Sequence, residues 1–364
     1  MRRTGKASDL SKRAGATMTL LAAVVLLIWA VVQGGPSGAV GGGGTGQGGA
    51  AAGADVGRSA SEQPAGDRVV PELSGASREQ KSSVRIASWN IEWLGNPDER
   101  SGASRGVAQD PSRLAEAIRR SQASVLALQE ISPTASVDPP RSRELDAIVR
   151  ALGPADRWRY VLFPSRSGDQ FTGFLWDSAR LDAVEEAGEL AWRVPVPARR
   201  SSQGSGLWVR PPYAMKFSAG TGRTDFVLIN VHMKADYRGD FAVQRDEEAS
   251  TLASLLADVR RVFQDADIAI LGDTNMVSAT EPAGERWRRA GLRDLNDRSV
   301  PTHWREGAMD RIFVGDQPEF ASSTFKVIDH TSVQSSPITP SEFKHQYSDH
   351  FLVWTTIELR ADDD

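Results

Sequence analysis

The chemistry of this chain is most visible at Asp267–Asn275, where DIAILGDTN places an acid and an amide directly after an apolar run. That run predicts a buried strand that ends at Gly272. Alternation along an extended chain puts Asp273 and Asn275 on the same side. Oxygen ligands of this kind at the edge of a sheet suit Mg²⁺, Mn²⁺ or Ca²⁺. Asp and Asn also favour turns, so a purely turn-forming role for both residues stays open.

Polar side chains of the same kinds lie where the other predicted strands begin or end. Each has a plain structural explanation when it is taken alone, because an acid can end a strand in solvent and a histidine can be satisfied within the core. Functional sites are commonly built from loops at one edge of a sheet. Because such polar side chains recur at the strand ends, we expect them to gather at one edge. The set combines carboxylates, an amide and two histidines, namely Asn90, Glu130, His232, Asp310, Asp349 and His350.

These residue types together predict a metal-dependent phosphoesterase. Glu130 with Asp349 or Asn90 can hold a divalent cation, which neutralises the phosphoryl oxygens and the leaving oxygen. Asp273 can orient or deprotonate the attacking water, and Asn275 can donate a hydrogen bond to a phosphoryl oxygen.

The two histidines of the set suit acid–base chemistry at a phosphate. His350 needs a partner that fixes its tautomer, and Asp310 is the natural candidate. His232 and His350 can flank the phosphate, one as base and the other as acid or charge stabiliser.

Arg210, in the segment WVRPPYAMKF, adds a guanidinium fork that can bind phosphate. Its alternative interpretation is an exposed arginine before a proline. The other histidines, His303, His330 and His345, lie in loop-like sequence and are assigned to the surface or to local packing. Of these, only His303 is close enough to Asp310 along the chain to be considered with the site.

Strands that alternate with helices predict a layered α/β domain over residues 84–364. Asp110 before Pro111 is typical of a helix start. Leucines at helical spacing predict a second helix over 245–263. The predicted strands are 84–91, 124–131, 157–164, 171–177, 224–233, 267–273, 309–316 and 349–359.

Composition excludes several kinds of chemistry. The 364 residues contain no cysteine, which rules out disulfides, thiol catalysis and cysteine-ligated metals. The formal net charge of the chain is −4, and residues 84–364 carry −7. So acidic a domain is a poor general nucleic-acid binder, because that affinity comes mostly from neutralising phosphates. A local basic patch can still guide a phosphate into one cleft.

The N-terminal part predicts an attachment to, or passage through, a membrane. Residues 14–32 are uncharged and follow several basic residues, so residues 1–33 are either a signal anchor or a cleaved signal peptide, and we favour the anchor. Residues 34–83 are Gly-rich and predict a flexible linker. The domain after them is expected outside the cytoplasm, either membrane-anchored through the N-terminal helix or secreted.

Six short segments of the chain match the motifs of a known superfamily and occur in the same order. They are SWNIEWLG (88–95), ALQEI (127–131), INVHMKA (229–235), LGDTN (271–275), PTHWREGAMDRIFV (301–314) and YSDHFLVW (347–354). In these segments the chain resembles the endonuclease/exonuclease/phosphatase superfamily, the family of deoxyribonuclease I, abasic-site endonucleases, neutral sphingomyelinases and inositol polyphosphate 5-phosphatases. The resemblance implies a four-layer α/β/β/α sandwich and divalent-metal-dependent hydrolysis of a phosphoester.

The resemblance also implies roles for single residues. Asn90 and Glu130 match the amide and glutamate of the metal site, and Asp349 matches the acid before the catalytic histidine. Gln170 stands where deoxyribonuclease I supports its second histidine with a glutamate, so a neutral amide is expected to orient His232. The remaining matches are the Asp273–Asn275 pair, the Asp310–His350 dyad and, for the substrate phosphate, Arg210.

Together these observations predict an extracytoplasmic, monomeric phosphodiesterase that cleaves DNA or RNA with Mg²⁺, or with Mn²⁺ or Ca²⁺ in its place. The nuclease is favoured because His232 and Arg210 resemble nuclease-type positions. The alternatives are a phospholipid or sphingomyelin phosphodiesterase or phosphatase at a membrane surface, and a non-catalytic binding domain.

Overall fold

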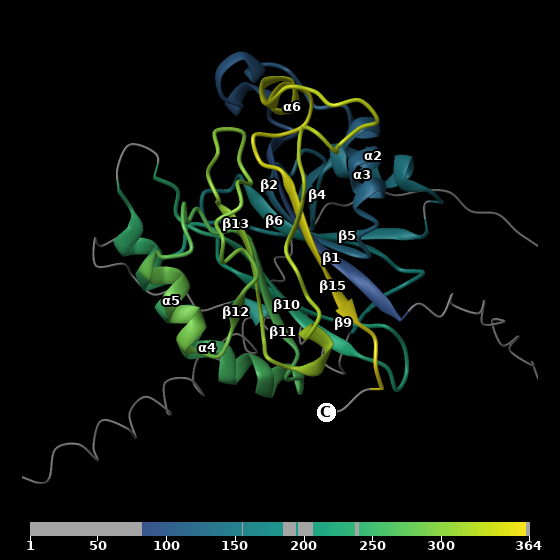
Figure 1. Ribbon diagram of the computed structural model, residues 1–364. Coiled ribbons are helices and arrows are strands. Elements are labelled where there is room, and N and C mark those ends of the chain that lie inside the picture. The colour runs from purple at the N-terminus through teal and green to yellow at the C-terminus, as the bar shows by residue number, and fades with distance from the viewer. Residues whose placement is uncertain (1–81, 155, 185–193, 196–206, 237–239, 362–364) are drawn as a thin grey trace, which may run out of the picture. The chain divides into compact units, whose positions relative to one another are not determined.

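Two packed β-sheets with helices on their outer faces form the part of the chain that the computed structural model describes (Figure 1). No helix among these residues is long and apolar enough to cross a bilayer. The predicted N-terminal segment 1–33 and the linker up to residue 81 lie outside the described residues. Those residues are 82–154, 156–184, 194–195, 207–236 and 240–361.

The first sheet has the strand order β14-β15-β1-β2-β6-β5. Its central pair, β1 and β2, is parallel, and every other neighbouring pair is antiparallel. The bounds are β1 Ser83–Leu94, β2 Val125–Ile131, β5 Trp158–Phe163, β6 Phe171–Asp177, β14 Lys326–Ile328 and β15 Leu352–Glu358.

The second sheet has the order β12-β13-β11-β10-β9-β7, with β8 also paired to β9. Its central pair, β10 and β11, is again parallel. The bounds are β7 Asp182–Ala183, β8 Val194–Pro195, β9 Tyr213–Ser218, β10 Asp225–His232, β11 Ile268–Asp273, β12 Arg293–Asp294 and β13 Asp310–Val314. A separate hairpin joins β3 Ser136–Val137 to β4 Pro140–Arg141.

Helices begin where capping residues allow it. The Asp110 side chain accepts a hydrogen bond from the backbone of Ser112, as the predicted cap requires. Thr339 and Glu342 form a capping box at the start of α6. The helices are α2 Pro111–Ser121, α3 Arg143–Leu152, α4 Ala242–Phe263, α5 Pro282–Arg289 and α6 Pro340–Gln346, with 3₁₀ turns η1 Pro97–Glu99, η2 Gly102–Ser104 and η3 Pro318–Phe320.

Among the described residues, three hydrophobic cores define the layers. Residues of both sheets, such as Phe174 and Phe217, fill the space between them. A second core packs α2 and α3 on the first sheet, around Trp89 and Ile118. A third core packs α4 and α5 on the second sheet, around residues such as Trp287. The order helix, sheet, sheet, helix is the arrangement that the family resemblance implies (Figure 1).

Two polar strand residues join the sheets and do not line the edge of the domain. Gln129 Nε2 donates to Asn230 Oδ1 at 2.8 Å, and Asn230 Nδ2 donates to the carbonyls of Leu128 and Gly173 at 3.0 and 2.7 Å. Both side chains are fully buried. They therefore satisfy each other within the core, as buried polar groups must.

Differences from the predicted elements concern short or weakly patterned segments. Strand β9 and helices α3, α5 and α6 were not predicted, and neither were the strands of two or three residues, which are too short to show a pattern, namely β3, β4, β7, β8, β12 and β14. The last strand begins at Leu352, whereas it was predicted from residue 349. The chain before it is drawn away by other bonds, since Phe351 N–H donates to the Thr302 carbonyl and Ser348 Oγ donates to the Asn90 carbonyl.

A close approach of the backbones precedes Asp273. Gly272 has φ +149°, and a Cβ there would lie 2.0 Å from the carbonyl oxygen of Val231 on β10. Only glycine fits this position, so it allows the β11 backbone to bring Asp273 beside the end of β10.

Replacing Gly272 by Ala is expected to lower the free energy of unfolding by about 1–3 kcal/mol, the range for overpacking a tight site. The measurement is urea unfolding of purified protein. The matched control is Gly291→Ala, which has φ +88° but open space around a Cβ. A Gly272→Ala variant as stable as this control would contradict the close approach.

Candidate active site

The ends of the two parallel strand pairs meet at one edge of the sandwich. Asn90 and Glu130 lie near the ends of β1 and β2 in the first sheet, and His232 and Asp273 end β10 and β11 in the second. Asp310 begins β13, which runs antiparallel to β11 and pairs Asp310 with Asp273. The fold therefore brings together polar residues that are far apart in the sequence.

The Asn90 amide links acids of both sheets. Its Nδ2 donates to Glu130 Oε1 at 3.1 Å and to Asp273 Oδ2 at 3.0 Å. Its Oδ1 accepts the Glu92 backbone N–H at 3.0 Å. The amide thus turns its nitrogen toward the acids and positions them, and the role of Asn90 as an oxygen ligand stays a prediction.

Asp273 lies between the two predicted histidines. Its Oδ2 is 3.5 Å from His232 Nε2 and 3.7 Å from His350 Nε2. His232 Nε2 is also 3.6 Å from Glu130 Oε1. These distances place acids and imidazoles from both sheets around one point, as the strand-end pattern predicts.

The Asp310–His350 pair has the geometry of a dyad. His350 Nδ1 lies 2.8 Å from Asp310 Oδ2, and both side chains are buried. The backbone of His350 is also fixed, because Trp89 Nε1 donates to its carbonyl at 2.9 Å. Burial alone would lower the pKa of His350, but the charges of Asp310 and Asp273 and the bond to Asp310 raise that pKa well above its ordinary value. The ring therefore favours the charged form at neutral pH.

Two carboxyl groups of the predicted metal site hold protons unusually firmly. Burial, and then the charge of Asp349, raise the pKa of Glu130 to about 7. Burial raises the pKa of Asp349 to about 6, with the charge of Glu92 adding to the effect and that of His350 opposing it. Burial of these acids disfavours their ionised forms, and hard oxygen donors are the ligands that Mg²⁺, Mn²⁺ and Ca²⁺ prefer. The residues present therefore fit a divalent cation.

Arg210 lies beside His232 and is held by three acceptors. It donates to the Gln170 side chain at 2.8 Å and to the carbonyls of His232 and Met233 at 3.3 and 2.9 Å. Burial, and then the charges of Arg210 and His350, lower the pKa of His232 well below its ordinary value. His232 is therefore neutral at pH 7.

The predicted contact between Gln170 and His232 is not the one that the structure has. The Gln170 side chain accepts from Arg210. Among the described residues, His232 Nδ1 has no hydrogen-bond partner. Gln170 therefore positions the Arg210 guanidinium. Its link to His232 runs through Arg210, which donates to both the Gln170 side chain and the His232 carbonyl.

Asn275 turns back toward the end of β10. Its backbone N–H donates to Asp273 Oδ1 at 2.9 Å, and its Nδ2 donates to the Met233 carbonyl at 3.1 Å. Its φ is 52°. These contacts agree with the turn-forming alternative and fix the Asp273 carboxylate.

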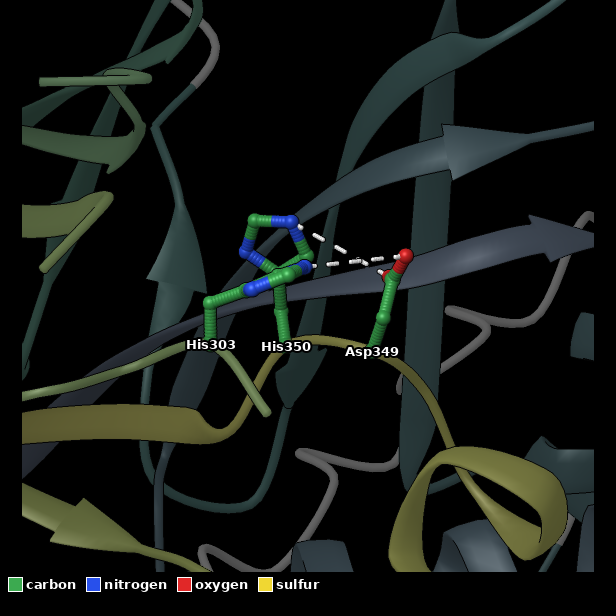
Figure 2. Close-up of side chains that lie close together, drawn as sticks. All are labelled: His303, Asp349 and His350. Carbon is green, nitrogen blue, oxygen red and sulfur yellow. Dashed lines mark ion pairs between the residues drawn. The ribbon is translucent and has the colours of Figure 1, made fainter. Parts of the chain in front are cut away.

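His303 belongs to the site, whereas the sequence analysis assigned it to the surface or to local packing and noted only that it is close to Asp310 along the chain. Its Nε2 lies 3.9 Å from Asp349 Oδ2, and its ring centroid lies 5.0 Å from that of His350. Figure 2 shows both rings turning a nitrogen toward the Asp349 carboxylate. The available signal was its place in a loop seven residues before Asp310.

A buried ion cluster supports the site from behind. Glu92 pairs with Arg100 at 2.9 Å and with Lys344 at 2.5 Å. All three side chains are nearly inaccessible to solvent. The cluster ties the bulged end of β1 to α6, which leads into Ser348–His350. Sequence alone did not predict this cluster, because its members lie far apart along the chain.

Strained backbone gathers around the same residues. Several non-glycine residues here have a positive φ, a conformation that costs about 1–3 kcal/mol and persists where the surroundings enforce it. The strands β1 and β2 also shift register near their ends. The residues are Glu92, Trp93, Glu130, Gln170 and Asn275.

Comparison with known proteins agrees with this architecture. A family model described as the Endonuclease/Exonuclease/phosphatase family matches residues 87–350. No curated protein matches the chain.

Solved structures resemble the fold at low identity. The human Nocturnin catalytic domain with bound sulfate has a TM-score of 0.50 and 16% identity over 77% of this chain and 96% of its own. A mannosyl-6-phosphatase of Bacteroides thetaiotaomicron has a TM-score of 0.52 and 18% identity over 76% and 100%. An endonuclease/exonuclease/phosphatase of Bacteroides vulgatus has a TM-score of 0.52 and 15% identity over 77% and 100%. At these identities the likeness shows the fold alone.

The raised pKa of Glu130 predicts how the metal-free protein responds to pH. The folded protein holds this proton up to about pH 7, whereas an ordinary glutamate loses it near 4.5. The contribution to stability is therefore fully present below pH 4.5 and is lost as the pH rises through 7. In EDTA, the melting temperature of wild type should fall more over this range than that of Glu130→Gln.

The control for this experiment is Glu99→Gln, at an exposed position outside the cluster. Mg²⁺ should raise the wild-type melting temperature most at high pH, because the cation takes the ionised carboxylate. Equal pH slopes for wild type and Glu130→Gln would contradict the assignment.

Proposed function

Because the chain belongs to the endonuclease/exonuclease/phosphatase family, we propose that this metal-dependent phosphoester hydrolase cleaves the phosphodiester bonds of DNA or RNA. The observation that supports the proposal most is the convergence of His232 and His350 on Asp273 from different sheets, within 3.7 Å. A phosphate placed there would meet the carboxyl group of Asp273, a charged imidazole and a neutral one.

Glu130 and Asp349 are the residues that would hold the divalent cation, with Asn90 positioning the Glu130 carboxylate. When bound, the cation supplies positive charge to the phosphoryl and leaving oxygens. The proposed ion is Mg²⁺, with Mn²⁺ or Ca²⁺ as substitutes, because all three prefer oxygen donors.

The side chains of the chain supply the acid–base chemistry. Asp310 holds Nδ1 of His350, and the other ring nitrogen, Nε2, therefore points toward Asp273 Oδ2. Charged His350 stabilises the negative charge that develops on the phosphate. Asp273, held by Asn90 and by the backbone of Asn275, orients the attacking water and accepts its proton.

The proposed preference for a nucleic acid rests on Arg210 and His232. Arg210 and neutral His232 lie side by side next to Asp273 and give the substrate phosphate a guanidinium and an imidazole. The proposed location outside the cytoplasm rests on the N-terminal sequence pattern. A membrane-surface phospholipid or sphingomyelin phosphodiesterase is the second candidate, since a tethered domain would meet lipid head groups.

The dyad predicts a large loss of activity in two variants. His350→Ala should abolish hydrolysis of bis-p-nitrophenyl phosphate. Asp310→Asn should lower kcat by at least about 10²-fold, because an amide does not stabilise the charged imidazole. Circular dichroism checks that both fold, and exposed His345→Gln is the matched control. Hydrolysis by His350→Ala within about tenfold of wild type would refute the role.

Substrate class is tested by offering plasmid DNA, RNA, sphingomyelin and bis-p-nitrophenyl phosphate to the purified protein side by side. Each is assayed with Mg²⁺, Mn²⁺, Ca²⁺ or EDTA, with His350→Ala as the blank. Metal-dependent cleavage of DNA or RNA that the blank lacks is the expected result. Turnover of sphingomyelin with intact nucleic acid would instead establish the lipid phosphodiesterase.

A further inference from the structure

His303 is locked in place opposite His350. The two residues form an isolated antiparallel bridge. Trp304 N–H donates to the Asp349 carbonyl at 2.9 Å, and Phe351 N–H donates to the Thr302 carbonyl at 2.7 Å. These bonds hold the loop before β13 against the chain before β15. The backbone of His303 is therefore held beside that of His350.

The local backbone also fixes which ring nitrogen of His303 carries the proton. Arg305 N–H donates to His303 Nδ1 at 3.2 Å. The turn that presents this N–H is closed by Glu306 N–H on the His303 carbonyl at 2.8 Å, and the Arg305 guanidinium lies over the Trp304 ring. A nitrogen that accepts a hydrogen bond keeps its lone pair, so the proton of the neutral ring is on Nε2.

The Nε2–H of His303 points toward the Asp349 carboxylate, next to the Asp310–His350 dyad. His303 Nε2 lies 3.9 Å from Asp349 Oδ2, which is too long for a hydrogen bond, and His350 Nε2 approaches the same carboxylate at 4.0 Å (Figure 2). An Nε2 that carries hydrogen has no lone pair for a cation. The two rings differ because His350 has a carboxylate on Nδ1, whereas His303 has a backbone donor there.

We propose that His303 is a further catalytic residue, a neutral imidazole that donates its Nε2–H to a phosphoryl oxygen of the bound phosphoester and does not ligate the cation. The proposal rests on the proposed function, since it needs the substrate phosphate to lie beside Asp349 and His350. A neutral donor fixed in advance stabilises charge that develops on an oxygen without any rearrangement at the moment of reaction.

The test compares wild type with His303→Phe, which keeps a ring without a donor, and His303→Gln, which returns an N–H near the Nε2 position. The control is exposed His345→Gln. Activity is measured on bis-p-nitrophenyl phosphate over a Mg²⁺ titration, and Mg²⁺ binding is measured by calorimetry. Nitrogen-15 spectra of the histidine rings report the tautomer, with and without inorganic phosphate.

The expected result is a loss of kcat of about 10²-fold in His303→Phe, as for removal of one oxyanion donor, with partial recovery in His303→Gln. Calorimetric Mg²⁺ affinity should be unchanged. The wild-type His303 ring should carry its proton on Nε2, and that signal should shift when phosphate is added with Mg²⁺.

Three outcomes would overturn the proposal. One is a His303→Phe kcat within about threefold of wild type. Another is Mg²⁺ affinity weakened by at least about tenfold with activity restored by excess Mg²⁺, which would make His303 a ligand. The third is a proton on Nδ1 in the spectra. If wild type and His345→Gln both lack activity, the proposed function fails, and the phosphate response of the ring still decides the role of His303.

Discussion

One hydrogen bond, from Asn90 Nδ2 to Asp273 Oδ2, joins the two sheets at the edge where the site lies. The donor belongs to β1 and the acceptor to β11, so the bond exists only if both sheets pack in one register. Gly272 is part of the same constraint, because a larger residue would push β11 away from β10. The Gln129–Asn230 contact fixes the sheets further inside. The active-site geometry therefore depends on the packing of the sandwich.

Crowding of buried acids is the second constraint. Glu130, Asp349 and Asp310 all have a raised pKa, chiefly because burial disfavours their charged forms. Positive charge nearby comes from His350 and from Arg210, which is itself partly buried. A bound cation would stabilise the ionised carboxylates, and the positively charged side chains would stabilise an anionic substrate. The site is therefore suited to bind a cation and an anionic substrate together.

The strained backbone of the site lies next to a buried ion cluster. Residues with a positive φ, Glu130 among them, lie at the irregular ends of β1 and β2. The ion cluster of Glu92, Arg100 and Lys344 holds the end of β1 in the same region. Such a cluster contributes position more than stability, since burying charges costs much of what their attraction gains. Ser348, which donates to the Asn90 carbonyl, connects this support to His350.

The sequence by itself determined the α/β class, the long strands, the family and most of the residues that meet at the site. These follow from local patterns: apolar runs that end in acids and amides, and short motifs in a fixed order. Tertiary structure alone decided the contacts among them. It turned the Asn90 amide toward the acids, paired Gln170 with Arg210 and brought His303 beside Asp349. A hydrogen-bond partner or a pKa depends on groups distant in the chain, and only packing of the two sheets brings those groups within a few ångströms.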